Sequence, residues 1–123
     1  MARLREETLQ RVETFADRVV DVAEALQKQR RFSRVVDQLA GSGTSVGANF
    51  FEANHALTTR DFVKTVGIAV KELSETKFWL RLIVRRGWIK PVRLARLLAE
   101  TDELLAIFNA MIVRSRRGLS NKK

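Results

Sequence analysis

Residues 45–80 read SVGANFFEANHALTTRDFVKTVGIAVKELSETKFWL, and they form the most informative part of the chain. Its apolar residues recur every three or four positions on both sides of a polar break at residues 58–61. Such spacing places them on one side of a helix, so the stretch predicts two helices joined by a turn. Thr58, followed three residues later by Asp61, fits the signature of a helix start, where a hydroxyl caps free backbone N–H groups. The second of these helices therefore begins at the turn.

The same spacing continues upstream. An apolar stripe predicts a first helix over about 4–29, and another predicts a second helix over about 33–55, with residues 29–31 left as the connection. The first stripe comprises Leu9, Val12, Phe15, Ala16, Val19, Val22, Ala23 and Leu26. The second comprises Phe32, Val35, Val36, Leu39, Gly43, Val46, Phe50, Ala53 and Leu57.

Downstream of the turn, the third helix is predicted to end near Arg86. Gly87 suits the left-handed position that follows a helix, and Pro91 suits the first turn of the next helix, where its missing N–H is not needed. A fourth helix is predicted over about 90–116. Residues from Gly118 onward are predicted to form a polar tail.

Four long helices with short connections must run up and down, because short connections leave no room for a crossover. The sequence therefore predicts an all-α, antiparallel up-and-down four-helix bundle. We expect a single domain over 1–117 and a flexible basic tail over 118–123. The tail either adds non-specific affinity for a polyanion or only solubilises the chain end. A composition of 46% hydrophobic and 30% charged residues is typical of globular domains.

Several classes of protein are excluded by composition. The chain has no Cys, which excludes disulfides and thiolate metal sites. It has no apolar run near the roughly 18 residues that cross a bilayer, so we expect a soluble protein with no membrane partner. The first ten residues mix acids and bases and lack the apolar segment of a secretory signal. We therefore expect a cytoplasmic location.

The third and fourth predicted helices carry more apolar surface than one core face needs. In the third helix, Ile68, Phe78, Trp79 and Leu82 lie off the main stripe. Because large exposed apolar patches mark contact surfaces, we predict a homo-oligomer in preference to a monomer with unusually wide core faces.

The second predicted helix contains Gly41, Gly43 and Gly47. Each costs roughly 1 kcal/mol of helix stability relative to Ala. Either a neighbouring helix or subunit approaches closely there, or the helix kinks or breaks near residues 41–43.

Residues of the opening stretch resemble a bacterial family of four-helix-bundle proteins encoded in intervening sequences of large-subunit ribosomal RNA genes. The match consists of Ser45-Val46-Gly47-Ala48-Asn49, Glu52-Ala53, Ala56, Thr58, Asp61-Phe62, Ile68-Ala69, Lys71-Glu72, Glu75-Thr76 and Phe78-Trp79-Leu80. The family is loosely related to the accessory protein of diversity-generating retroelements. The resemblance implies a homopentameric bundle without known enzymatic activity, and, through the retroelement relatives, nucleic-acid binding.

The charge points to a polyanionic partner. The net charge is +9 and the sequence pI is about 11.0. In an up-and-down bundle the first and third connections lie at the same end, which would bring eight cations together. These are Lys28, Arg30, Arg31, Arg34, Arg85, Arg86, Lys90 and Arg93. Repeated around a ring, they would form a positive rim that binds phosphates, with Trp88 available to stack on an unpaired base.

A structural interpretation of the same residues stays open. Cations at helix C-termini interact favourably with the negative end of the helix dipole, which accounts for the basic residues from Lys28 to Arg31 and for Arg85 and Arg86. It does not account for Arg34, Lys90 or Arg93, which lie at predicted helix starts. In this interpretation Trp88 packs under the loop.

Polar residues within the resembling segment are predicted to fix register and partner choice in the assembly, with ligand binding as the alternative. They are Asn49, Glu52, Lys71, Glu72 and Glu75, together with Trp79.

Catalysis lacks the necessary side chains. Glu52 and His55 form one Glu-x-x-His unit, whereas di-iron bundles need two with further carboxylates, and His55 is the only His. The alternative interpretation is that Glu52 and His55 form polar contacts near the turn between the second and third helices. We expect no metal site, no cofactor and no enzymatic activity.

Two functions remain. The first is a homo-oligomeric, pentameric scaffold that binds structured RNA or an RNA–DNA hybrid through the basic rim. The second is a protein-interaction hub that docks a partner protein such as a reverse transcriptase.

Overall fold

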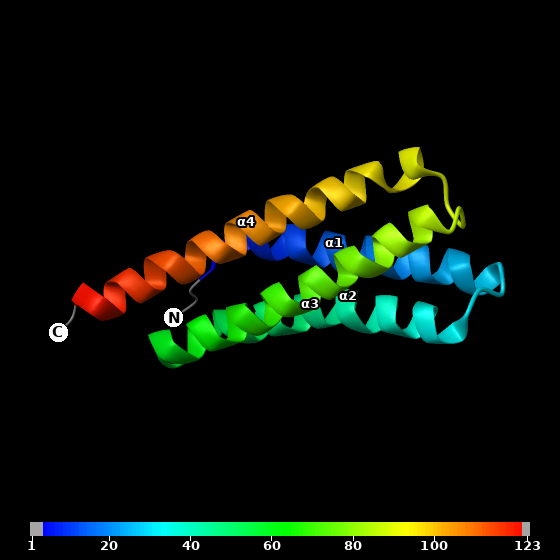
Figure 1. Ribbon diagram of the computed structural model, residues 1–123. Helices are drawn as coiled ribbons and strands as arrows, with labels where there is room; N and C mark the ends of the chain where they lie inside the picture. Colours follow the sequence, from blue (N-terminus) through cyan, green and yellow to red (C-terminus); the bar gives the residue numbers. More distant parts are fainter. Residues whose placement is uncertain (1–3, 122–123) are drawn as a thin grey trace.

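The computed structural model describes residues 4–121 and confirms the predicted all-α, four-helix fold. The helices are α1 (Glu6–Lys28), α2 (Ser33–Asn54), α3 (Thr59–Arg85) and α4 (Pro91–Asn121). They run up and down in chain order, so that the α1–α2 and α3–α4 connections lie at one end (Figure 1). None of these four helices is long and apolar enough to cross a membrane.

The C-terminal part of α4 differs from the prediction. The helix continues to Asn121, past the predicted end near residue 116, so residues 118–121 are helical and not a tail. A glycine ends a helix when it adopts a left-handed conformation, and Gly118 does not: Gly87 is the one described glycine with a positive φ. The rest of the predicted tail, residues 122–123, lies outside the described residues.

The core is formed by the predicted apolar stripes, and the pairs of helices that follow each other in sequence pack most closely. Phe50 of α2 and Phe108 of α4 stack across its centre with ring centroids 4.6 Å apart. Phe32 and Leu57 of the predicted stripes are largely exposed, at 75% and 93%. Both lie outside the helices, where the helical periodicity that would turn them inward no longer applies.

Gly43 resolves the question raised by the glycines of α2. The helix is continuous from Ser33 to Asn54, so it does not break. A Cβ atom on Gly43 would lie 2.8 Å from Cβ of Val19, which is too close for a real contact. Gly41 faces open space, and a Cβ on Gly47 would make only an ordinary contact. Close approach of α1 therefore requires a glycine at position 43 alone.

Polar groups inside the bundle are paired. Ser42 of α2 and Thr76 of α3 are both buried, and the Thr76 hydroxyl donates to Oγ of Ser42 at 2.9 Å. The Ser42 hydroxyl in turn donates to the carbonyl of Leu39. At the start of α3, Oγ1 of Thr58 accepts a hydrogen bond from the backbone N–H of Asp61 at 3.0 Å. The predicted N-cap is confirmed, and these bonds fix how α2 and α3 meet.

Candidate nucleic-acid interface

The candidate interface begins where α1 and α3 end, at the end of the bundle that holds both connections. At the end of α3, the N–H of Trp88 binds the carbonyl of Ile83 and the N–H of Gly87 binds that of Val84. This pair of bonds is the Schellman motif, which requires a left-handed residue in its centre. Gly87 fills that position with φ +69°, as predicted.

The end of α1 repeats the same motif with an arginine in the centre. The N–H of Arg31 binds the carbonyl of Leu26, and the N–H of Arg30 binds that of Gln27. Arg30 is held at φ 57°, in the left-handed region that costs an L-residue roughly 1–2 kcal/mol. Arg30 is the one non-glycine residue with positive φ in the described chain. Its side chain therefore projects from a strained turn at the basic end.

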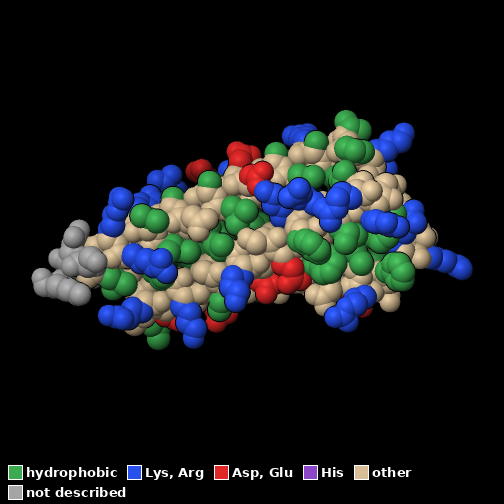
Figure 2. Space-filling view, viewed as in Figure 1, with side chains coloured by type: hydrophobic (Ala, Val, Ile, Leu, Met, Phe, Trp, Pro, Cys, Tyr) green, Lys and Arg blue, Asp and Glu red, His purple; other side chains and the backbone are tan. Residues whose placement is uncertain are grey.

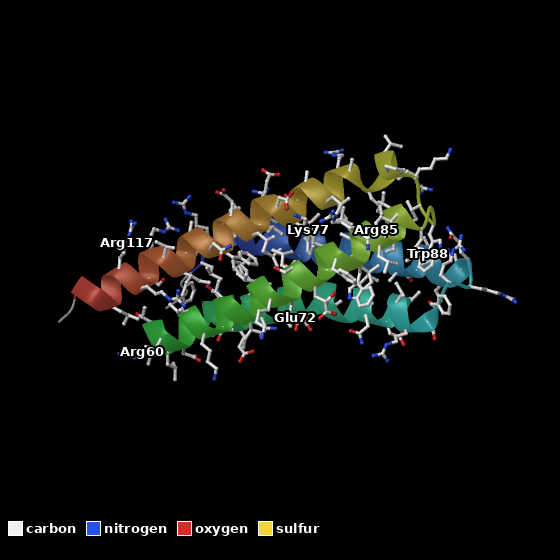
Figure 3. The ribbon with its side chains drawn as sticks, in the orientation of Figure 1. Arg60, Glu72, Lys77, Arg85, Trp88 and Arg117 are labelled. Carbon is white, nitrogen blue, oxygen red and sulfur yellow. The ribbon has the colours of Figure 1, made fainter. Side chains whose placement is uncertain are left out.

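We use the term basic end for the eight predicted cations, which lie in the two connections and the adjoining helix turns. Figure 2 shows Lys and Arg side chains over much of the face in view, those at this end lying among apolar side chains, and Figure 3 labels Arg85 there. The eight cations are Lys28, Arg30, Arg31, Arg34, Arg85, Arg86, Lys90 and Arg93. All eight are exposed. Every ion pair among residues 4–121 involves other side chains, so none of the eight has a carboxylate partner there.

Helix dipoles account for only part of this cluster. Lys28 and Arg85 lie in the last turns of α1 and α3, where cations are favourable. Arg34 is the second residue of α2, Arg93 is the third of α4, and Lys90 directly precedes α4. Those three lie at positive dipole ends, where their charge is unfavourable, so helix stability does not account for them.

Trp88 has a different role from the one predicted. It is half-buried and packs against the core, and the guanidinium carbon of Arg31 lies 5.2 Å from the centroid of its ring. The ring face is therefore covered by a cation–π contact and is not an open platform for a base. The alternative, that Trp88 packs under the loop, is correct. The contact joins the two connections and holds Arg31 in place.

The predicted polar positions of the resembling segment lie along α2 and α3, away from the basic end. Asn49 donates from Nδ2 to the carbonyl of Ser45 at 2.8 Å, and Nε1 of Trp79 donates to a carboxylate oxygen of Glu75 at 3.0 Å. Both bonds stay within one helix. The remaining three, Glu52, Lys71 and Glu72, form no ion pair among residues 4–121, so their part in assembly stays a prediction.

Glu52 and His55 are both exposed near the end of α2. Within residues 4–121, no three His, Asp or Glu side chains converge as metal ligands would.

The arrangement of charges at the basic end is suited to binding a polyanion and offers no acid–base pair for proton transfer.

Sequence reasoning missed the ion pairs that join helices. Arg11 of α1 binds both carboxylate oxygens of Glu100 at 2.7 Å and reaches Glu103 of α4 at 3.3 Å. Lys77 of α3 binds Asp102 of α4 at 2.6 Å. Helical periodicity identifies which face a residue occupies but not which turn of another helix lies opposite. Predicting these ion pairs from the sequence would require knowing how far one helix is shifted along the other.

Comparison with known proteins places the fold in a family. The chain is similar to a crystal structure of a protein of unknown function from the S23 ribosomal protein family of Bacteroides thetaiotaomicron VPI-5482, with 31% identity and a TM-score of 0.80. That match covers 85% of this chain and 96% of the other. No curated protein matches the chain. The family model for 23S rRNA-intervening sequence proteins matches residues 6–110. The chain therefore belongs to the 23S rRNA-intervening sequence protein family.

Proposed function

We propose that this protein is a non-enzymatic, homo-oligomeric scaffold that binds structured RNA or an RNA–DNA hybrid in the cytoplasm through its basic end. The observation that carries the proposal is the set of eight exposed cations without a carboxylate partner. Unpaired Lys and Arg side chains replace the counterions of a phosphate backbone, and the release of those counterions drives binding.

The strained turn supports the same function. A glycine at position 30 would form the Schellman motif without the left-handed penalty, as Gly87 does at the equivalent position of α3. Strained residues that the fold tolerates concentrate at functional sites. An arginine at that position adds a cation to the basic end at the expense of local stability.

The homo-oligomer is supported by surfaces away from the basic end. Phe51, Ile68 and Phe78 are 44%, 38% and 51% exposed on α2 and α3. Charge is also divided between the two halves of the bundle. Residues 6–54 carry eight acids against six bases, and residues 59–121 carry thirteen bases against six acids. A head-to-tail contact would pair these unlike halves, and such contacts form a ring when their rotation closes, as in the pentamer proposed here.

Binding is tested by fluorescence anisotropy with a labelled RNA hairpin and an RNA–DNA hybrid. Neutralising Arg85, Arg86, Lys90 and Arg93 together as Gln is expected to weaken binding roughly a hundredfold or more at moderate salt. The matched control carries Gln at Arg60, Lys64, Arg114 and Arg117, which removes the same charge from α3 and α4 away from the basic end. Equal losses in both variants would contradict a localised interface.

Oligomeric state is tested by sedimentation equilibrium. A pentamer would have five times the 14.1 kDa mass of the chain. A monomer at micromolar concentration would contradict the oligomeric part of the proposal and leave the basic end untouched.

A protein-interaction hub is the second candidate, and one observation favours it. Phe32 and Val92 are 75% and 78% exposed beside the cations of the basic end, and exposed apolar groups among charges suit a protein partner. A reverse transcriptase with an acidic surface would fit. If the four-residue Gln variant loses RNA binding but still binds such a partner, the scaffold proposal stands. The hub would be favoured if the parent protein has no affinity for RNA and the four-residue Gln variant loses binding to the partner protein.

A further inference from the structure

A groove runs between α1 and α4, the neighbouring helices that pack least closely in the bundle. Its volume is about 370 Å³, within the range of small-molecule sites. It is lined by Arg11, Thr14, Phe15, Arg18, Arg96, Ala99, Glu100 and Glu103. None of these residues belongs to the basic end, so a ligand in this groove would occupy a separate site.

The two carboxylates in the groove are already occupied. Arg11 binds both oxygens of Glu100 through two hydrogen bonds of 2.7 Å and approaches Glu103 at 3.3 Å. The hydrogen bonds that Arg11 donates to Glu100 raise the pKa of the Arg11 guanidinium further above its ordinary value. This paired geometry is the strong form of a guanidinium–carboxylate contact. Both carboxylates of the groove are therefore paired with Arg11.

Arg18 of α1 and Arg96 of α4 are left without a counter-ion. Both are exposed and line the same groove from opposite helices, and neither forms an ion pair within residues 4–121. Like charges on facing helices repel unless an anion lies between them. Thr14 contributes a hydroxyl to the same lining, and the buried ring of Phe15 contributes an apolar wall.

We propose that the groove between α1 and α4 is a phosphate-binding site in which Arg18 and Arg96 bind the phosphate oxygens. Guanidinium groups match phosphate geometry through paired N–H donors, and two of them from different helices can hold one phosphate between them. Arg11 is a positioning residue, because it keeps Glu100 and Glu103 away from the two free arginines. The phosphate belongs either to a small phosphorylated molecule or to a polynucleotide.

The test uses isothermal titration with inorganic pyrophosphate and with a short oligouridylate. Both are titrated into the protein whose Arg85, Arg86, Lys90 and Arg93 are Gln, so that the contribution of the basic end is reduced and is the same in every variant compared. Arg18→Gln and Arg96→Gln are each expected to weaken binding roughly tenfold, as the loss of a charged hydrogen bond would. Arg60→Gln, which removes an exposed arginine at the far end of α3, is the matched control and is expected to have no effect (Figure 3).

The two probes distinguish the source of the phosphate. Pyrophosphate binding that depends on Arg18 and Arg96 supports a small phosphorylated ligand. Oligouridylate binding with the same dependence, and none for pyrophosphate, supports a polynucleotide. If Arg18→Gln and Arg96→Gln change neither titration, the site is overturned, and nucleic-acid binding at the basic end is unaffected by that result.

Arg11 provides an independent test of the arrangement. Arg11→Gln is expected to weaken binding although the side chain does not touch the phosphate, because Glu100 is then free to pair with Arg96 one helical turn away. Adding Glu100→Gln to that variant should restore binding. A purely structural role for Arg11 would give no such restoration, and that outcome would overturn the positioning role. Glu103→Gln alone is expected to strengthen binding, since it removes a competing carboxylate.

Discussion

The α2–α3 contact and the basic end treat their polar side chains in opposite ways. Where α2 meets α3, Ser42 and Thr76 are buried and bind each other, and Thr58 caps the helix start. At the basic end, eight cations are exposed and none binds a carboxylate among residues 4–121. Polar groups paired inside the fold specify its geometry, whereas unpaired charges are available to a ligand. Substitutions in the first region should therefore change stability, and substitutions in the second should change binding.

The largest stability effect is expected beside the α2–α3 contact, at Gly43. Gly43→Ala places a Cβ 2.8 Å from Cβ of Val19, and overpacking of this kind costs about 2 kcal/mol. Urea denaturation at one fixed chain concentration measures the loss. Gly41→Ala is the control: open space surrounds that site, so the better helix propensity of Ala should raise stability by roughly 0.5–1 kcal/mol. Equal stability of the two variants would contradict the close approach of α1 and α2.

A smaller effect is expected for the buried hydroxyl pair. Ser42→Ala removes the acceptor of the 2.9 Å bond from Thr76 and should cost no more than about 1 kcal/mol, because the Thr76 hydroxyl can still donate to the carbonyl of Glu72 at 2.9 Å. The double variant Ser42→Ala with Thr76→Val removes both hydroxyls and should recover part of that loss. The same denaturation experiment measures both. The affinity for RNA should stay unchanged in both variants. A fall in RNA affinity together with stability would contradict the separation of stability at the α2–α3 contact from binding at the basic end.

The smallest effect on stability is expected at Arg30, whose left-handed conformation lowers stability while its side chain adds a charge to the basic end. Arg30→Gly relieves the left-handed strain but gives the unfolded chain more freedom, so the net gain in stability should stay below about 1 kcal/mol. RNA affinity should fall several-fold because one cation is lost. Gly87→Ala at the equivalent position should instead destabilise the protein, by about 1 kcal/mol. A gain in both stability and RNA affinity from Arg30→Gly would contradict a binding role for this arginine.

Local chemistry explains how much of the molecule could be predicted. Apolar spacing and the signals at Thr58, Gly87 and Pro91 identified the helices, because helix limits depend on neighbouring residues. The predicted end of the fourth helix before Gly118 was wrong, because a glycine ends a helix in this way only when its φ is positive, and that of Gly118 is not.

The contacts between helices could not be predicted in the same way. The eight cations were located because up-and-down topology alone brings the two connections together. The partners of Arg11, Gly43 and Trp88 depend on how far one helix is shifted along another, and that shift is set by packing of the whole core.

The salt dependence of RNA binding shows whether the basic end binds phosphates. Affinity for a labelled RNA hairpin would be measured between about 50 and 200 mM salt, for the parent protein and for the variant with Gln at Arg85, Arg86, Lys90 and Arg93. We predict a steep linear fall of log affinity with log salt, and a slope that is shallower in the variant by roughly one unit per lost phosphate contact. A parent affinity that does not change with salt, or identical slopes for the two proteins, would contradict a phosphate-binding basic end.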